Sequence, residues 1–174
     1  MPLRSPTPES TQALGAALAR AIDGDGAIIL LSGPLGAGKT CFVQGLAAGL
    51  GIPSDRVQSP TFVIAQELPL PAGGVLVHAD CYRVSSEAEL ESAGLLDWLA
   101  PGCVVIAEWA ERVPGAWPAD RLEIAIARDA AERRFTIEAT GPASRALVAR
   151  WRAALPSADR DAPDSPEASQ VPES

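Results

Sequence analysis

A glycine-rich octet, Gly33-Pro34-Leu35-Gly36-Ala37-Gly38-Lys39-Thr40, carries the clearest chemistry in this sequence. It matches G-x-x-x-x-G-K-[ST], the loop whose backbone N–H groups surround the phosphates of a nucleoside triphosphate. Lys39 is the only lysine, and every other strongly basic side chain is arginine. A compact ammonium on a flexible stem suits the β- and γ-phosphate oxygens, and the Thr40 hydroxyl suits Mg²⁺. The octet therefore predicts a nucleotide and magnesium site.

Two acidic residues are placed to complete such a site, because each follows a short apolar segment. Glu108 follows residues 103–107, and Asp80 follows residues 75–79. In an α/β sheet, the carboxyl ends of the strands border the ligand crevice. Glu108 is therefore predicted to hold Mg²⁺ directly or through water, with a carboxylate at the strand rim as the alternative. Asp80 is predicted to lie near the metal or to orient water, with a salt bridge to Arg83 as the alternative.

Three further residues carry less specific signals. Thr61 follows a proline in a predicted loop, where it either senses the γ-phosphate or caps a turn. Trp109 is either part of the core or a ring beside the nucleotide. His78, the only histidine, lies within a predicted strand, and a structural role with its hydrogen bonds satisfied is favoured there.

The octet has the flanking elements that a phosphate-binding loop requires. Residues 27–32 are apolar and rich in β-branched side chains, which predicts a buried strand. Residues 42–50 have apolar side chains at helical spacing, and Gly51 closes that segment. The order is thus strand, glycine loop and helix, which places the positive end of the helix dipole at the phosphates.

The remaining pattern predicts an α/β fold. Helices are expected from Thr7 to about Ile22, from Ser86, at 95–99 and at 144–155; strands are expected at 62–66, 75–79 and 103–107, with a hairpin from 121–127 and 135–139. These elements predict a P-loop NTPase-like mixed sheet, with a parallel core, an antiparallel hairpin extension and helices on both faces. Residues 1–155 are expected to form the ATPase domain, and 156–174 a disordered acidic tail rich in Pro and Ser.

Composition narrows the class of protein. A chain of 174 residues that is 47% hydrophobic, without a membrane-length apolar run or a signal pattern, predicts one folded cytoplasmic domain. Cys41, Cys81 and Cys103 lack metal-ligand spacing and are expected to be reduced thiols. A net charge of −8 gives no electrostatic basis for direct binding to nucleic acid. GTPases read guanine with N-K-x-D, which a second lysine would have to supply, so ATP is the predicted nucleotide.

The sequence contains four motifs in series: Gly33 to Thr40, Ser59-Pro60-Thr61-Phe62, His78-Ala79-Asp80-Cys81-Tyr82-Arg83 and Glu108-Trp109. In this order they resemble one family, the bacterial tRNA threonylcarbamoyladenosine biosynthesis ATPases called TsaE. The resemblance spans about residues 7–142, and the tail lies outside it. Small departures are Cys41 in place of a hydroxyl residue, Cys81 in place of a larger apolar residue, and Ala110 in place of proline or serine.

The resemblance implies a function that composition does not reveal. Members of this family bind and hydrolyse ATP with Mg²⁺, weakly when alone, and act with TsaD and TsaB in modifying position 37 of tRNA. Contact with tRNA is then expected only through that complex. The resemblance assigns metal binding to Thr40 and Glu108, and hydrolysis to Lys39, Asp80, Glu108 and Thr61. Its implied nucleotide contacts are the octet from Gly33 to Thr40, Cys41, Trp109, Thr7 and Arg133.

Two other functions remain open from the sequence. A small-molecule P-loop kinase would need an arginine-bearing lid and an acceptor pocket, and no arginine cluster here has the pattern of a lid. A nucleotide-sensing subunit that does not hydrolyse ATP would keep the loop without needing the catalytic acids. Assays for phosphoryl transfer and for ATP hydrolysis with TsaB and TsaD separate the three.

Overall fold

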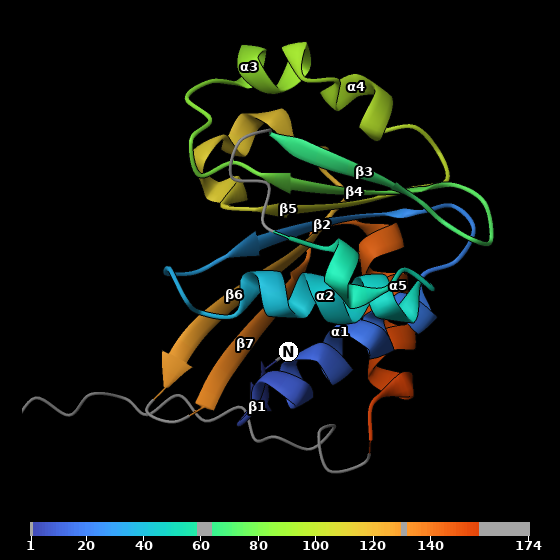
Figure 1. Ribbon diagram of the computed structural model, residues 1–174, viewed down its shortest axis with the longest axis vertical. Helices are drawn as coiled ribbons and strands as arrows, with labels where there is room; N and C mark the ends of the chain where they lie inside the picture. Colours follow the sequence, from blue (N-terminus) through green and yellow to red (C-terminus); the bar gives the residue numbers. More distant parts are fainter. Residues whose placement is uncertain (1, 59–63, 130–131, 157–174) are drawn as a thin grey trace, which may run out of the picture.

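The computed structural model contains a seven-stranded mixed sheet in the order β1-β7-β6-β2-β5-β4-β3. It describes residues 2–58, 64–129 and 132–156 (Figure 1). The strands are β1 (Pro2–Ser5), β2 (Ala27–Ser32), β3 (Ala65–Pro69), β4 (Val75–Asp80), β5 (Cys103–Glu108), β6 (Leu122–Asp129) and β7 (Glu132–Ala139).

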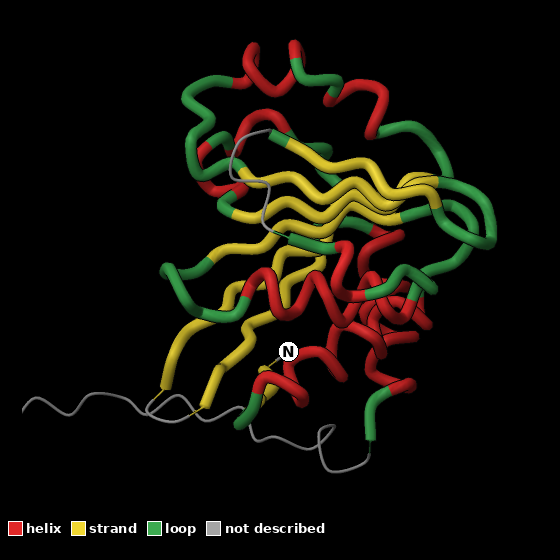
Figure 2. The backbone as a smooth tube through the Cα atoms, in the orientation of Figure 1, coloured by secondary structure: helices red, strands yellow, loops and turns green. Residues whose placement is uncertain are grey.

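The sheet has a parallel centre and antiparallel margins, as predicted. Strand β2 pairs in parallel with both β5 and β6, and β4 continues the parallel set beyond β5. On one side, β3 returns antiparallel to β4; on the other, β7 returns antiparallel to β6 and also pairs with β1. Figure 2 shows the strands as one continuous twisted layer. Strand β2, which leads into the glycine loop, is therefore flanked by strands on both sides.

Helices cover both faces of this sheet, which confirms the predicted layering (Figure 1). One face, here called the long-helix face, packs against α1 (Pro8–Ala21), α2 (Lys39–Gly49) and α5 (Pro142–Ala154). The opposite or short-helix face packs against α3 (Glu87–Ser92), α4 (Leu95–Trp98) and the 3₁₀ turns η2 (Ala110–Arg112) and η3 (Pro114–Ala116). A further turn, η1 (Ser54–Arg56), follows α2. No helix in the described ranges has the length and apolar content needed to cross a membrane.

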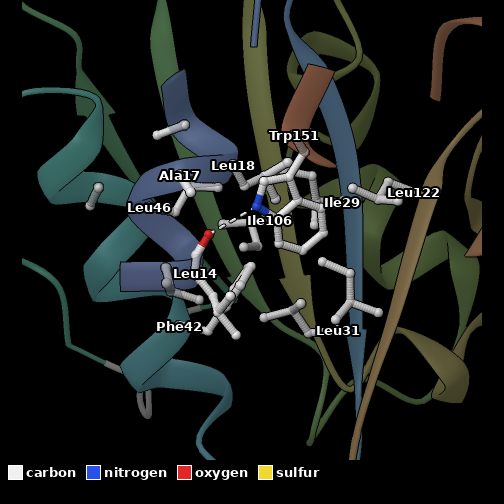
Figure 3. Packing of buried hydrophobic residues seen from close by; sticks show 14 of the residues in the cluster. Leu14, Ala17, Leu18, Ile29, Leu31, Phe42, Leu46, Ile106, Leu122 and Trp151 are labelled. Atoms are coloured by element: carbon white, nitrogen blue, oxygen red, sulfur yellow. Dashed lines mark hydrogen bonds between the residues drawn. The ribbon is translucent and has the colours of Figure 1, made fainter. Parts of the chain in front are cut away.

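The long-helix face is organised around a buried tryptophan of α5. Trp151 is fully buried, and its indole N–H donates to the Leu14 carbonyl of α1 at 3.2 Å. The Phe42 ring of α2 meets it edge-on, with the ring centroids 6.1 Å apart. Figure 3 shows these side chains closing over the strand residues Ile29 and Leu31. One aromatic side chain thus joins three helices to the centre of the sheet.

Helices α1 and α2 cross at very short distance because their contact is made by glycine. A Cβ atom added to Gly45 would lie 2.1 Å from the Gln12 carbonyl oxygen, and one added to Gly15 would lie 2.3 Å from the Phe42 carbonyl oxygen. Neither position has room for a methyl group. This contact fixes the helix that begins directly after the glycine loop, so it also fixes where the loop sits.

Several element boundaries differ from the sequence-based prediction. Strand β3 begins at Ala65 and continues to Pro69, whereas the predicted strand began at residue 62; residues 59–63 lie outside the described part. Strands β6 and β7 are longer than predicted, and α5 begins earlier, at Pro142. Strand β1 was not predicted, because its four residues are ordered through pairing with β7. The tail predicted to be disordered lies beyond the described residues.

Candidate nucleotide-binding site

The glycine loop occupies the carboxyl end of β2 and leads directly into α2. Gly33, Gly36 and Gly38 have φ angles of 135°, 74° and 107°, a region that favours glycine because it has no Cβ atom. At Gly38 space is also restricted, since an added Cβ would lie 2.8 Å from the Arg133 Nε atom. The glycines at these positions therefore match the backbone geometry as well as the motif.

Lys39 is buried at the base of the loop. Its ammonium donates to the carbonyl oxygens of Gly33 at 2.7 Å and Pro34 at 3.1 Å, and lies 3.6 Å from the centroid of the Trp109 ring. Burial lowers the pKa of Lys39, while nearby carboxylates, chiefly Glu108, oppose that shift. The ammonium is thus held between the loop and an aromatic face, an arrangement that stabilises a cation.

Glu108 meets the loop helix through Thr40. The Thr40 hydroxyl donates to Oε1 of Glu108 at 2.9 Å, and Nε2 of His78 lies 3.0 Å from the same oxygen. Glu108 is only 3% exposed, although it carries a carboxylate. The strand register explains the meeting, because Glu108 ends β5 opposite Leu31, near the end of β2. Two residues predicted independently from sequence are therefore hydrogen-bonded to each other.

Thr40 and Glu108 provide oxygen atoms of the kind that a magnesium ion prefers as ligands. Mg²⁺ prefers oxygen ligands and is usually held by one or two protein groups together with substrate phosphates and water. Thr40 supplies a hydroxyl and Glu108 a carboxylate, side by side at the start of α2. Within the described ranges, no three His, Cys, Asp or Glu side chains cluster as a metal cage. A hydroxyl beside a carboxylate therefore fits a Mg²⁺ ion that is shared with a nucleotide.

Asp80 lies at the same edge of the sheet as Glu108. The two residues are register partners at the ends of β4 and β5. Oδ1 of Asp80 accepts a hydrogen bond from the Tyr82 backbone N–H at 2.9 Å, which orders the turn that leaves β4. The predicted convergence of the two strand-end acids is thus present in the structure, while the role of Asp80 stays a prediction.

Trp109 lies beside the loop lysine rather than wholly in the core. It has a left-handed backbone, with φ of 59°, and is the one residue other than glycine with a positive φ in the described ranges. Its backbone N–H donates to the Leu31 carbonyl at 2.9 Å, and its ring centroid lies 5.1 Å from that of Tyr82. The ring also packs partly against the short-helix core. The ring thus lies between the loop lysine and the short-helix core, and its place beside a nucleotide stays a prediction.

The outer nucleotide-binding candidates lie at different distances from the loop. Arg133 of β7 reaches it, since its Nε donates to the Ala37 carbonyl at 3.1 Å. Cys41 contacts the start of α1, where its thiol donates to the Pro8 carbonyl at 3.3 Å. Thr7 caps that helix by accepting from the Ser10 N–H at 3.2 Å, so its observed contact is structural. Thr61 lies outside the described residues.

His78 contacts the candidate site through Glu108, although the interpretation of the sequence gave it no part there. The ring is fully buried, and its structural role stays a prediction; the prediction of satisfied hydrogen bonding is wrong for one nitrogen. Nε2 meets Glu108, whereas Nδ1 has no hydrogen-bond partner among the described residues. The spacing contained a usable signal: His78 precedes Asp80 by two residues, so both side chains lie on one face of β4.

Comparison with known proteins gives consistent matches. Residues 5–136 match the family model described as threonylcarbamoyl adenosine biosynthesis protein TsaE. A protein of Bacillus subtilis called tRNA threonylcarbamoyladenosine biosynthesis protein TsaE is 40% identical over 141 residues, which cover 79% of this chain and 85% of the relative. A protein of the same name from Streptomyces coelicolor is 39% identical, over 74% of this chain and 86% of the relative.

A solved structure extends the likeness to three dimensions. The crystal structure of Bacillus subtilis YdiB matches with a TM-score of 0.70 and 33% sequence identity, covering 87% of this chain and 93% of YdiB. The matched residues 5–136 include the glycine loop, Asp80, Glu108 and Trp109. The chain therefore belongs to the TsaE family of threonylcarbamoyl adenosine biosynthesis proteins.

Proposed function

We propose that this chain binds and hydrolyses ATP with Mg²⁺ in the cytoplasm and that its cycle supports a TsaB–TsaD complex that forms threonylcarbamoyladenosine at position 37 of tRNA. The observation that carries this proposal is the hydrogen bond of 2.9 Å between Thr40 and Glu108. It joins the last residue of the glycine loop to a strand-end acid, the combination that magnesium-dependent phosphoryl transfer uses. The relatives named above are tRNA threonylcarbamoyladenosine biosynthesis proteins.

Each residue of the site has a distinct part in this proposal. The loop N–H groups and the start of α2 bind the phosphates, and the Lys39 ammonium neutralises charge on the β- and γ-oxygens. Thr40 and Glu108 would hold Mg²⁺, which when bound neutralises phosphate charge and aligns the reacting oxygens. Asp80, at the neighbouring strand end, orients the attacking water; Thr61 is proposed to support this step.

The contacts of Lys39 favour slow ATP hydrolysis by the protein when it is alone. The Lys39 ammonium lies against the Trp109 ring and two loop carbonyls, so it must exchange these contacts for phosphate contacts. A partner that favours the exchanged arrangement would accelerate the cycle. The net charge of −8 fits a subunit that reaches tRNA through TsaB and TsaD rather than directly.

Two variants and a reconstitution test the proposal. Lys39→Ala should abolish ATP binding in calorimetry, because the phosphate charge loses its counterion, whereas Glu108→Gln should retain most binding but lose turnover. Wild-type turnover should rise on addition of TsaB and TsaD. Binding of ATP without any hydrolysis in that mixture would instead identify a nucleotide-sensing subunit. Phosphoryl transfer to a small molecule in the absence of partners would identify a kinase.

A further inference from the structure

His78 is buried in a position that packing alone does not explain. Its imidazole is fully buried on β4, with Ile106 as its register partner on β5 and Gln66 on β3. Its Nδ1 atom has no hydrogen-bond partner among the described residues, and burying a polar atom in this way opposes folding. A leucine would fill similar space without that penalty. The polar contact that the ring does make is therefore the feature to explain.

That contact is with one particular oxygen of the proposed magnesium ligand. His78 Nε2 lies 3.0 Å from Glu108 Oε1, and the Thr40 hydroxyl donates to the same oxygen at 2.9 Å. Because Oε1 is an acceptor in a carboxylate, Nε2 must carry the hydrogen. Two donors converge on Oε1 from different elements, β4 and α2. They fix the rotation of the carboxylate, and with it the direction of its second oxygen.

We propose that His78 is a positioning residue: it holds the Glu108 carboxylate in the orientation that binds Mg²⁺, and thereby sets the affinity for the metal rather than for the nucleotide. The inference rests on the function proposed above and specifies one residue within it. Thr40 would itself turn toward the metal, which leaves His78 as the partner that keeps Oε1 in place. Groups that hydrogen-bond to a metal ligand commonly change metal affinity about 10- to 100-fold when removed.

The test compares two substitutions that differ by one methylene. The amide nitrogen of Gln reaches the position of Nε2 and can donate to Glu108, whereas the amide of Asn reaches only the position of Nδ1. Mg²⁺ is titrated into each protein saturated with ADP, and ADP affinity is measured separately in EDTA. His78→Asn should weaken Mg²⁺ binding by about 10-fold or more. His78→Gln should recover wild-type affinity to within about threefold, and ADP affinity in EDTA should be equal in all three proteins.

The outcomes separate this inference from the proposed function. If wild-type protein with ADP binds no Mg²⁺, the proposed function fails and the inference fails with it. If the wild type binds Mg²⁺ and His78→Asn binds it equally well, the inference alone is wrong. Equal losses in the Asn and Gln variants would also overturn it, because the donor at the Nε2 position would then be irrelevant. Thermal unfolding of each variant shows whether a loss reflects misfolding.

A measurement on the unmodified protein covers the case in which His78→Asn does not fold. His78 is the only histidine, so its ring nitrogens give the only imidazole signals in a long-range ¹H–¹⁵N NMR spectrum. We expect Nε2 to show the chemical shift of a protonated nitrogen and to respond when Mg²⁺ is added to the ADP-bound protein. A neutral ring with its hydrogen on Nδ1 would contradict the proposed contact. An Nε2 signal unchanged by Mg²⁺ would contradict the proposed role.

Discussion

The two faces of the sheet are covered by helices of very different length. On the long-helix face, α1, α2 and α5 have 14, 11 and 13 residues, whereas α3 and α4 on the short-helix face have 6 and 4. Helices of one or two turns are not stable by themselves and depend on their packing. The candidate site draws Lys39 and Thr40 from the first face, while Trp109 directly precedes η2 on the second. The proposed phosphate-binding residues thus lie on the face covered by long helices, and the face covered by short helices borders them.

The largest expected effect is the loss of stability when one buried tryptophan on each face is replaced by alanine. Trp151→Ala should lower the free energy of unfolding by about 4 kcal/mol, because three helices meet at this ring and cannot all close the cavity. Trp98→Ala, on α4, should cost about 3 kcal/mol, at the low end of the usual range, because a short helix can collapse onto the space. Both rings are at least 96% buried, so burial does not distinguish them. Urea unfolding measures both losses; equal losses would refute the difference between the faces.

Hydrogen exchange should reveal the same difference without any substitution. Backbone amides of α3 and α4 are expected to exchange by local opening at least about 100-fold faster than those in the middle of α2, after correction for sequence. In free energy this is roughly 3 kcal/mol. Mass spectrometry of exchanged peptides resolves the two regions. Protection of α3 and α4 equal to that of α2 would show that the sheet and both layers open together.

The close crossing of α1 and α2 can be broken with a single methyl group. Gly45→Ala should lower the free energy of unfolding by about 2 kcal/mol, as overpacking of about 3 is offset by about 1 from better helix propensity. The matched control is Gly24→Ala, since a Cβ there would meet nothing within 4 Å. The control should change stability by less than about 0.5 kcal/mol. If Gly45→Ala left the unfolding temperature unchanged, the two helices would be able to move apart without loss of stability.

The smallest expected effect concerns the start of α5. Asp120 accepts hydrogen bonds from the N–H groups of Ala143 at 2.8 Å and Ser144 at 2.9 Å, and the hydrogen bonds with Ser144 lower the pKa of Asp120. The stabilisation is therefore present above the ordinary Asp pKa of about 4 and is lost as the pH falls through the lower folded value. Asp120→Asn retains an acceptor that does not titrate. The stability advantage of the wild type over this variant should narrow on acidification; a constant difference in urea midpoints would contradict the assignment.

Features that depend on neighbouring residues were predictable from sequence. The strand at residues 27–32 coincides with β2, and the glycine loop continues into α2 as its motif requires. Glu108 and Asp80 were placed at strand ends by the apolar runs before them, and the register brings them opposite each other. In each case the pattern lies within a few residues of the feature it predicts.

Features that depend on distant segments were not predictable in the same way. Nothing within Pro2–Ser5 indicates a strand, because its order comes from β7. The contact of His78 with Glu108 depends on how β4 and β5 align. The left-handed backbone at position 109 was not predictable either, because such a conformation is usually indicated by glycine and this residue is Trp109. Arg133 was placed near the nucleotide by resemblance alone; the structure brings it to the loop through the hairpin of β6 and β7.

The pairing of β1 with β7 has a consequence for how the protein is made. Pro2 lies opposite Thr136, so β1 has no partner until the chain has been translated as far as β7. Strand β2 likewise has no neighbouring strand until β5 and β6 have been translated. At a synthesis rate of about 5–20 residues per second, the apolar side chains of β2 therefore stay exposed for several seconds. The strand that leads into the glycine loop is thus translated well before the two strands that enclose it.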